Sequence, residues 1–120
     1  MVILGVDDSA TMRKIIGLAV KSDGNTFIEA ENGQDALNKL TTQKVDLFLV
    51  DINMPVMGGL EFITKVRSQP AYIKAPIIII TTENEQAMRD AGMKAGANDW
   101  IVKPFEKEQL LSVIGRLKKV

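Results

Sequence analysis

Two uninterrupted apolar runs limit what this chain can fold into more than any other feature of its sequence. The first is Leu47–Val50 and the second is Ile77–Ile80, which consists of isoleucine alone. A strand with one face in water alternates apolar and polar residues, whereas a strand that is covered on both faces is apolar throughout. We therefore predict that both runs are central strands of a sheet with helices packed on both sides.

Strand-like and helix-like segments alternate along the whole chain. The predicted strands lie at residues 2–6, 26–30, 46–50, 76–80 and 99–102. The second and the fifth are more mixed in composition, which favours the edges of the sheet. Strand–helix pairs joined by short loops predict a parallel sheet with right-handed crossovers and helices on both faces. No linker or internal repeat divides the chain, so residues 1–120 are expected to form one domain.

Capping residues mark where the intervening helices are expected to begin. The first, second, third and fifth helices are predicted to start after Ser9, at Asn32-Gly33, after Gly58-Gly59 and after Pro104. Thr82 and Glu85 have the spacing of a capping box, which predicts that the fourth helix opens there. Gly5 is unusual because it interrupts the first strand, at an expected cost of ~0.5–1 kcal/mol.

Charged and hydroxyl residues follow four of the predicted strands, each at the point where an apolar run ends. They are Asp7 and Asp8, Asp51, Thr81 and Lys103. The carboxyl ends of parallel strands meet at one edge of the sheet, where such folds bind their ligands, so we expect these side chains to lie close together. Neighbouring carboxylates repel one another, and a divalent cation such as Mg²⁺ is the obvious compensation.

These residue types together suit phosphoryl chemistry. A carboxylate such as Asp51 can accept a phosphoryl group and form an acyl phosphate. Lys103 could pair with the phosphoryl oxygens, and the Thr81 hydroxyl could donate a hydrogen bond to them. Taken singly, each residue has a structural explanation: a strand end for Asp51 or Thr81, a helix cap for Asp8 and a solvated surface for Lys103. The conjunction of all of them is what predicts a site.

Composition removes several other functions. Lys and Arg number 15 and so do Asp and Glu, and a net charge of zero gives no support to a nucleic-acid or polybasic membrane partner. The chain has no cysteine and no histidine, which excludes disulfides, imidazole bases and the usual zinc sites. Any metal must therefore be held by oxygen atoms. The apolar runs are too short to span a membrane and no basic leader is visible, so the cytoplasm is the expected location.

At this point the sequence resembles the receiver (response-regulator) domain family and, within it, the single-domain chemotaxis regulators of the CheY-like type. The diagnostic segments occur in the family's order: Val6-Asp7-Asp8-Ser9, Val50-Asp51-Ile52-Asn53-Met54-Pro55-Val56-Met57, Ile80-Thr81-Thr82 and Val102-Lys103-Pro104-Phe105. The resemblance covers essentially the whole chain. It implies an α/β, flavodoxin-like, doubly wound sheet of five parallel strands in the order 2-1-3-4-5, with five helices.

The resemblance also implies roles for the residues at the strand ends. Asp51 would be the phosphoacceptor, and Thr81 and Lys103 would hold the phosphoryl group. Magnesium would be surrounded by the side chains of Asp7, Asp8 and Asp51 and by the backbone carbonyl of Asn53. The bond between Lys103 and Pro104 corresponds to a cis peptide in the family.

Further positions correspond to residues that control switching in the family. Trp100 stands where the family has an aromatic residue that turns inward as Thr81 moves toward the phosphoryl group. Asn53 and Glu83 lie two residues beyond the acceptor and beyond the switch threonine, and these positions set the lifetime of the acyl phosphate. The pair found here is typical of fast-cycling chemotaxis regulators.

The implied function is that of a stand-alone response regulator. A sensor histidine kinase would donate the phosphoryl group, since the chain has no histidine of its own. The phosphorylated monomer would bind an output protein such as the flagellar motor switch, and a phosphatase could reset it. The chain would be no enzyme beyond promoting its own phosphorylation and dephosphorylation. A phosphorelay intermediate, a phosphate sink and docking on some other enzyme remain alternative outputs.

Three other functional classes compete with this interpretation. A phosphatase with an aspartate nucleophile needs a second carboxylate two residues later, where this chain has Asn53. A flavodoxin-like cofactor binder needs a phosphate-binding loop after the first strand, where Asp7 and Asp8 would repel the phosphate. A receiver-shaped module that is never phosphorylated would have no need for the complete acceptor set.

Overall fold

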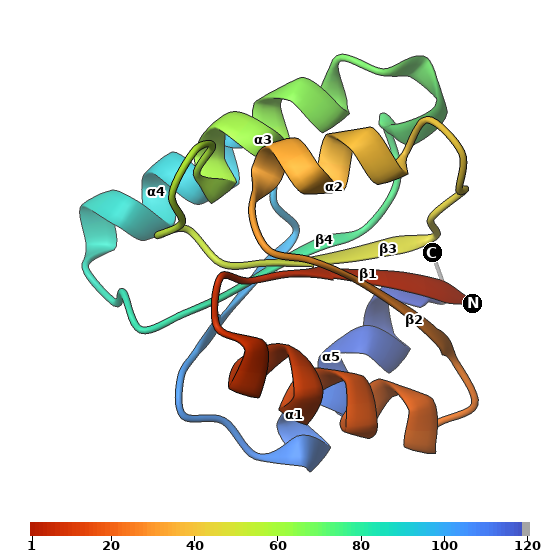
Figure 1. The fold of residues 1–120 in the computed structure, drawn as a ribbon. Coiled ribbons are helices and arrows are strands. Elements are labelled where there is room, and N and C mark those ends of the chain that lie inside the picture. The colour runs from red at the N-terminus through yellow and green to blue at the C-terminus, as the bar shows by residue number, and fades with distance from the viewer. Residues whose placement is uncertain (119–120) are drawn as a thin grey trace.

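The computed structural model of the chain describes residues 1–118. Five parallel strands form one sheet in the order β2-β1-β3-β4-β5, as the resemblance implied (Figure 1). Their bounds are β1 Val2–Val6, β2 Thr26–Ala30, β3 Leu47–Val50, β4 Ile77–Thr81 and β5 Asp99–Val102. The prediction placed β3 and β4 one residue too early at their starts, and Thr81 lies inside β4 as its last residue.

The helices cover both faces of the sheet, which confirms the doubly wound fold. α1 Ala10–Ser22 and α5 Lys107–Lys118 lie on one face. The other face carries α2 Gly33–Lys39, α3 Gly59–Arg67 and α4 Gln86–Ala95, with a short 3₁₀ turn at Pro70–Tyr72 after α3 (Figure 1). Among the described residues, no helix has both the length and the apolar content that crossing a membrane requires.

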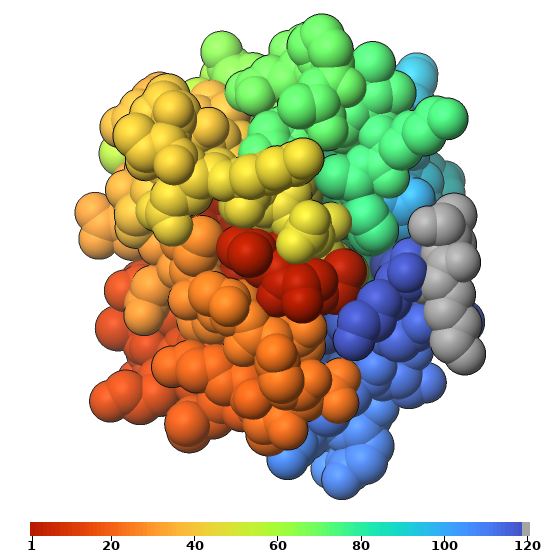
Figure 2. Space-filling view, turned by 90° about the vertical axis from the view of Figure 1, so that its right-hand side faces the viewer, coloured from red at the N-terminus to blue at the C-terminus, as the bar shows by residue number. Residues whose placement is uncertain are grey.

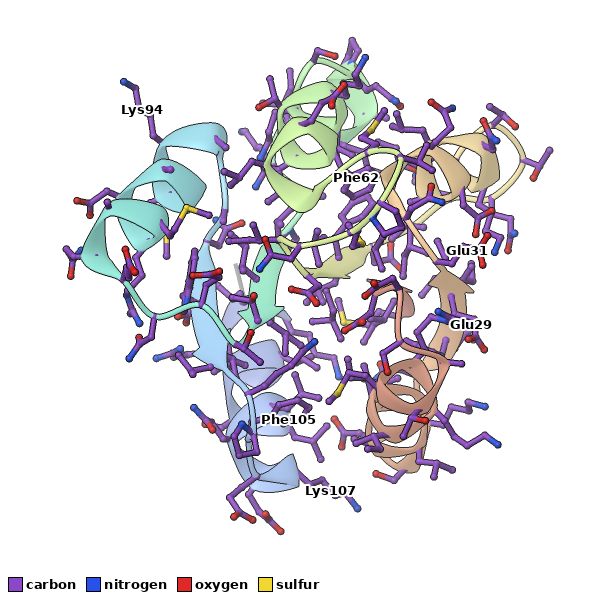
Figure 3. All side chains as sticks on the ribbon, turned by 60° about the vertical axis from the view of Figure 1, so that its left-hand side comes forward. Glu29, Glu31, Phe62, Lys94, Phe105 and Lys107 are labelled. Atoms are coloured by element: carbon purple, nitrogen blue, oxygen red, sulfur yellow. The ribbon has the colours of Figure 1, made fainter. Side chains whose placement is uncertain are left out.

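The isoleucine run of β4 contributes to both hydrophobic cores, as an apolar strand covered on two faces should. Ile77 and Ile79 belong to the core beneath α2, α3 and α4, whereas Ile78 and Ile80 belong to the core beneath α1 and α5. Phe62 points from α3 toward the sheet (Figure 3) and meets the Phe48 ring edge-on, with 6.0 Å between the ring centroids.

The register of the strands explains why polar side chains gather at one edge. Val6 pairs with Ala30 on one side and with Val50 on the other, so Asp7 and Asp51 leave β1 and β3 at the same level. Thr81 pairs with Val102, which places Lys103 one residue beyond the end of β5. The loops that follow β1, β3, β4 and β5 therefore start side by side at this edge.

The opposite edge of the sheet is closed by the start of the chain. Figure 2 shows the first residues, in red, between the segment before β3, in yellow, and the region of β2, in orange. Asp46 holds them in place, because its carboxylate accepts a hydrogen bond from the Val2 amide at 2.7 Å and its own amide donates to the Val2 carbonyl at 2.8 Å. These two bonds tie the start of the chain to the segment before β3, at the edge opposite the polar side chains.

Gly5 interrupts β1 because an aromatic ring occupies the space of its missing side chain. A Cβ atom on Gly5 would lie 2.6 Å from a ring atom of Phe27, and one on Gly17 of α1 would lie 2.7 Å from the same ring. Both glycines thus let the Phe27 ring sit between β2 and α1. The expected cost of a glycine in the strand is offset by this packing.

The prediction for the start of α4 was wrong. The helix begins at Gln86, its N-cap is Glu85, and no side chain caps it. Thr82 and the residues up to Glu85 form a loop instead of a first turn. The reason is that Glu83 is bonded to residues from two other elements, described below, which hold this segment away from the helix. The predicted caps of α1 and α2 are confirmed, since Ser9 accepts from the Met12 amide and Asn32 from the Asp35 amide.

Candidate functional site

Three carboxylates meet at the carboxyl edge of the sheet, as the strand ends predicted. Asp7 and Asp8 come from the loop between β1 and α1, and Asp51 comes from the loop between β3 and α3. One oxygen of each carboxylate lies within 4.8 Å of the others. Asp7 and Asp51 are only 2% and 7% exposed, whereas Asp8 faces the solvent. Such a group of negative charges needs a compensating cation.

Lys103 supplies part of that compensation. Its Nζ atom lies 2.7 Å from Asp7 Oδ2 and 3.0 Å from Asp51 Oδ2. Burial by itself lowers the pKa of Lys103, but the hydrogen bonds and the negative charges of Asp7 and Asp51 outweigh it, so that the pKa is raised above its ordinary value. The ammonium therefore stays charged at neutral pH.

Backbone amides hold the remaining oxygens of the two buried carboxylates. The Ile52 amide donates to Asp51 Oδ1 at 2.7 Å, and the Ser9 amide donates to Asp7 Oδ1 at 2.9 Å. One ammonium against three carboxylates still leaves an excess of negative charge. Hard oxygen ligands with excess negative charge fit Mg²⁺ or Ca²⁺, so the residues present suit the cation that the sequence implied.

Thr81 lies at the same edge, one strand over from Asp51. It is fully buried as the last residue of β4, and its carbonyl accepts a hydrogen bond from the Lys103 amide at 2.8 Å. Its Oγ1 atom accepts from the Glu83 amide at 3.4 Å. The Thr81 hydroxyl is thus hydrogen-bonded to the loop before α4, and the Thr81 backbone is hydrogen-bonded to Lys103.

Asn53 and Glu83 touch each other across the site. Asn53 Nδ2 donates to Glu83 Oε1 at 3.1 Å, which joins the loop after β3 to the loop after β4. The carbonyl of Glu83 accepts a hydrogen bond from Trp100 Nε1 at 3.1 Å. The resemblance implied a role in acyl-phosphate lifetime for Asn53 and Glu83 and a role in switching for Trp100. Their mutual contacts connect residues far apart in the chain and leave no mark in the local pattern.

Trp100 is buried beneath α4, with 5% of its surface exposed. The space for its large ring comes from Gly92 of α4, where a Cβ atom would lie 2.8 Å from the ring atom Cζ3. Arg89 covers the ring from above, with its guanidinium carbon 5.7 Å from the ring centroid. The pairing of Gly92 with Trp100 was not apparent from the sequence.

The loop after Asp51 is held close to the acceptor by a strained turn and a glycine. Val56 has a φ of 68°, which a β-branched residue rarely adopts, and the Met57 amide donates to the Pro55 carbonyl at 2.7 Å across it. At the end of the loop, a Cβ atom on Gly59 would overlap the Asp51 carbonyl oxygen. Only glycine therefore lets α3 begin directly against the acceptor residue.

Two more features complete the edge. The peptide bond between Lys103 and Pro104 is cis, as the resemblance implied. Arg13 of α1, which the sequence did not single out, donates a hydrogen bond from Nη1 to the Asp7 carbonyl at 2.7 Å. A bond to a backbone carbonyl requires no particular residue type at the acceptor, so no motif could have revealed it.

Comparison with known proteins agrees with this geometry. The sequence model of the response regulator receiver domain matches residues 3–115. A chemotaxis protein CheY homolog of Campylobacter jejuni is 44% identical over 121 residues, covering 96% of this chain and 93% of the relative. Vibrio cholerae chemotaxis protein CheY4 superposes with a TM-score of 0.92 at 37% identity, covering 97% of both chains.

A further solved structure bears on the acidic cluster. The receiver domain of sensor histidine kinase PA1611 from Pseudomonas aeruginosa has a TM-score of 0.91 at 28% identity, covering 99% of this chain and 98% of that one. It contains a magnesium ion coordinated in its active-site cleft. With the strand order, the acidic edge and the match over residues 3–115 in agreement, this chain belongs to the response regulator receiver domain family of two-component signalling, as a CheY-like member.

Proposed function

We propose that the chain is a response regulator that accepts a phosphoryl group on Asp51 from a histidine kinase, with Mg²⁺ as cofactor. The observation that carries the proposal is the environment of Asp51. Its carboxylate is nearly buried, lies within 4.8 Å of two other carboxylates and contacts the Lys103 ammonium at 3.0 Å. A structural carboxylate would not require such a costly concentration of charge.

The residues at this edge suit each part of the transfer. A carboxylate oxygen of Asp51 would attack the phosphorus atom, while the bond to the donor's nitrogen or oxygen breaks and the donor leaves with that electron pair. The Lys103 ammonium, which already contacts Asp51, would then pair with the negatively charged phosphoryl oxygens. Asp7, Asp8, Asp51 and the Asn53 carbonyl would hold Mg²⁺. The bound ion would stabilise the negative charge on the same phosphoryl oxygens.

The donor is expected to be a separate molecule, because the chain contains no histidine. A phosphohistidine of a sensor kinase or a small acyl phosphate would serve. Water would later attack the phosphorus, the bond between the phosphorus and the Asp51 oxygen would break, and inorganic phosphate would leave as the carboxylate is regenerated. Asn53 and Glu83, which contact each other, would tune the rate of this step. The chain would thus promote only its own phosphorylation and dephosphorylation.

Switching is proposed to pass from Thr81 to the face made by α4, β5 and α5. A phosphoryl group adds acceptor oxygens that the Thr81 hydroxyl can approach, which would release its bond to the Glu83 amide. Glu83 also accepts from the Trp100 indole, so the loop and the ring would move together. A partner that prefers the altered face would bind more tightly and in turn stabilise the phosphorylated state.

Motor control in chemotaxis is the output we favour. It is supported by the 44% identity to a CheY homolog and by the contacting pair of Asn53 and Glu83. The partners would be a kinase, a flagellar switch protein and a possible phosphatase, acting on a monomer in the cytoplasm. A phosphorelay intermediate or phosphate sink would use the same acceptor. A pull-down with and without beryllofluoride, which mimics the phosphoryl group, distinguishes these outputs from motor control by the partner that is captured.

Labelling with radioactive acetyl phosphate in the presence of Mg²⁺ tests the acceptor. The unaltered chain should incorporate label that is lost in base, and Asp51→Asn should incorporate none. Asp90→Asn is the matched control, because Asp90 is an exposed aspartate on α4. Equal labelling of Asp51→Asn and the unaltered chain would place the acceptor elsewhere. Steady turnover of p-nitrophenyl phosphate would favour the phosphatase alternative instead.

A further inference from the structure

We propose that Arg13 is a positioning residue for the metal site: it fixes the peptide group that joins Asp7 to Asp8. Arg13 Nη1 donates to the Asp7 carbonyl at 2.7 Å, and Arg13 Nε donates to Glu29 Oε1 at 2.7 Å. The Arg13 side chain is only 15% exposed. Its partner Glu29 is 56% exposed, so Arg13 is the buried member of the ion pair, and its guanidinium bridges β2 and the loop that carries two of the three carboxylates.

The bonded carbonyl belongs to the peptide group between the two aspartates. Because a peptide group is planar and rigid, holding its oxygen also sets the direction in which the chain continues to Asp8. Asp7 makes three other contacts: its amide donates to the Ala30 carbonyl at 3.1 Å, and its carboxylate accepts from Lys103 Nζ at 2.7 Å and from the Ser9 amide at 2.9 Å, the last bond spanning Asp8. Arg13 adds a side-chain hydrogen bond to the oxygen of the peptide group between the two aspartates. Arg13 therefore acts on the placement of exposed Asp8 relative to buried Asp7.

Glu29 serves as the anchor for Arg13. It lies in β2, in register with Gly5 of β1, and Figure 3 shows it on that strand beside α1. Its backbone carbonyl accepts a hydrogen bond from Lys39 of α2. The planar guanidinium can donate from Nε to this carboxylate and from Nη1 to the carbonyl at once, whereas the single ammonium of a lysine cannot reproduce that fork.

Electrostatics alone would give Arg13 the opposite effect. A positive charge near a cation site weakens cation binding, so removing it would tighten Mg²⁺ if charge were all that mattered. If Arg13 positions the carboxylates, its removal loosens the site and weakens Mg²⁺ binding. The two explanations thus differ in the sign of the change, and Arg13→Lys separates them further because it keeps the charge and loses the fork.

The inference rests on the magnesium part of the proposed function and is tested by calorimetric titration of the full chain with MgCl₂. Both Arg13→Met and Arg13→Lys should bind Mg²⁺ about tenfold more weakly than the unaltered chain, a loss of the size found for groups that orient metal ligands. Glu29→Gln should show a smaller loss in the same direction. Lys14→Met, an exposed lysine on the same helix, is the matched control and should leave the affinity unchanged.

Phosphorylation by acetyl phosphate over a range of Mg²⁺ concentrations gives a second measurement. Arg13→Lys should need about tenfold more Mg²⁺ for half-maximal rate and should reach the unaltered maximal rate at saturation. General damage to the fold would lower the maximal rate as well. If Arg13→Met does not fold, the two single variants Arg13→Lys and Glu29→Gln still test the proposal.

If Arg13→Met and Arg13→Lys bound Mg²⁺ as tightly as the unaltered chain or more tightly, the positioning role of Arg13 would be overturned and the proposed function would stand. A lowered maximal rate with an unchanged Mg²⁺ requirement would have the same meaning. The unaltered chain is the reference for the metal itself. If it took up no Mg²⁺, the metal part of the proposed function would fail first, and the role of Arg13 with it.

Discussion

At the scale of single residues, Lys103 decides the charge balance of the acidic edge. Its ammonium contacts one oxygen each of Asp7 and Asp51, and its own surface is 12% exposed. Removing one partner from a largely buried ion pair leaves the remaining charges uncompensated, which costs about 3 kcal/mol. The contribution of Lys103 to stability therefore depends on its protonation.

This dependence predicts how the stability of the fold changes at alkaline pH. The folded pKa of Lys103 is raised above the unfolded value of about 10.5, so its contribution is fully present below pH 10.5. It is lost as the pH rises through the folded pKa. Urea unfolding of the unaltered chain and of Lys103→Met should thus differ by about 3 kcal/mol at pH 8 and by progressively less above pH 10.5.

The comparison with Lys103→Met removes the effect of all other groups that titrate at alkaline pH, because both proteins contain them. Free Mg²⁺ is kept out with a chelator, since the metal would compensate the carboxylates in the variant. A difference in unfolding free energy that stays constant from pH 8 to pH 12 would contradict the assignment of this effect to Lys103.

At the scale of elements, α4 is held differently at its two ends. Its N-terminal end has no side-chain cap and adjoins the loop that contains Glu83. Its C-terminal end is fastened by Arg67 of α3, whose guanidinium donates to the Gly96 carbonyl at 2.7 Å and to Asn98 Oδ1 at 2.9 Å. Between them, Gly92 lies against Ile79 and the Trp100 ring. The C-terminal end of α4 is thus fixed by direct bonds from α3, whereas its N-terminal end is held through the loop that carries Glu83 and through Arg89 over the Trp100 ring.

The contact between Gly92 and Trp100 predicts the effect of adding a methyl group. In Gly92→Ala, the Cβ atom would lie 2.6 Å from Ile79 Cδ1 and 2.8 Å from Trp100 Cζ3, so α4 or the indole must shift. Overpacking of this kind costs ~1–3 kcal/mol, which exceeds the gain of about 1 kcal/mol from replacing glycine in a helix. Net destabilisation should accompany a red shift in the fluorescence of Trp100, the one tryptophan of the chain.

Gly115 of α5 is the matched control, because a Cβ atom there would have nothing within 4 Å. Gly115→Ala should stabilise the protein by about 1 kcal/mol through helix propensity and leave the tryptophan emission unchanged. Identical effects of the two substitutions on stability and fluorescence would show that the space beneath α4 is looser than the contacts of Gly92 indicate.

The elements also show which features a sequence can reveal. The apolar runs of β3 and β4 are local signals, and because parallel strands end at one edge, the charged residues that follow them could be placed together in advance. The start of α4 could not, because Glu83 is held by Asn53 and Trp100 from other elements. Arg13 was missed since its acceptor is a backbone carbonyl, and Gly5 was explained only by the ring of Phe27.

At the scale of the whole molecule, the acidic edge exists only in the folded chain. Asp7 and Asp8 are far from Asp51 in sequence, and the parallel register brings their oxygens within 4.8 Å. An unfolded chain has no such group of ligands. A divalent cation that binds the cluster must therefore favour the folded state, while repulsion among the carboxylates acts against folding when no metal is present.

This linkage predicts that Mg²⁺ raises the free energy of unfolding by an amount set by its own affinity. At a free concentration of 100 times the dissociation constant, the gain should be about 2.7 kcal/mol, and a chelator should remove it. Thermal unfolding in MgCl₂ and in EDTA at equal ionic strength measures the difference, with Asp8→Asn as the test variant and Asp23→Asn, an exposed aspartate at the end of α1, as the control. Asp8→Asn should be at least as stable as the unaltered chain in EDTA, because one repelling charge is gone, yet gain much less from Mg²⁺. An equal gain in both variants would mean that Mg²⁺ acts on the surface at large and that the cluster does not bind it.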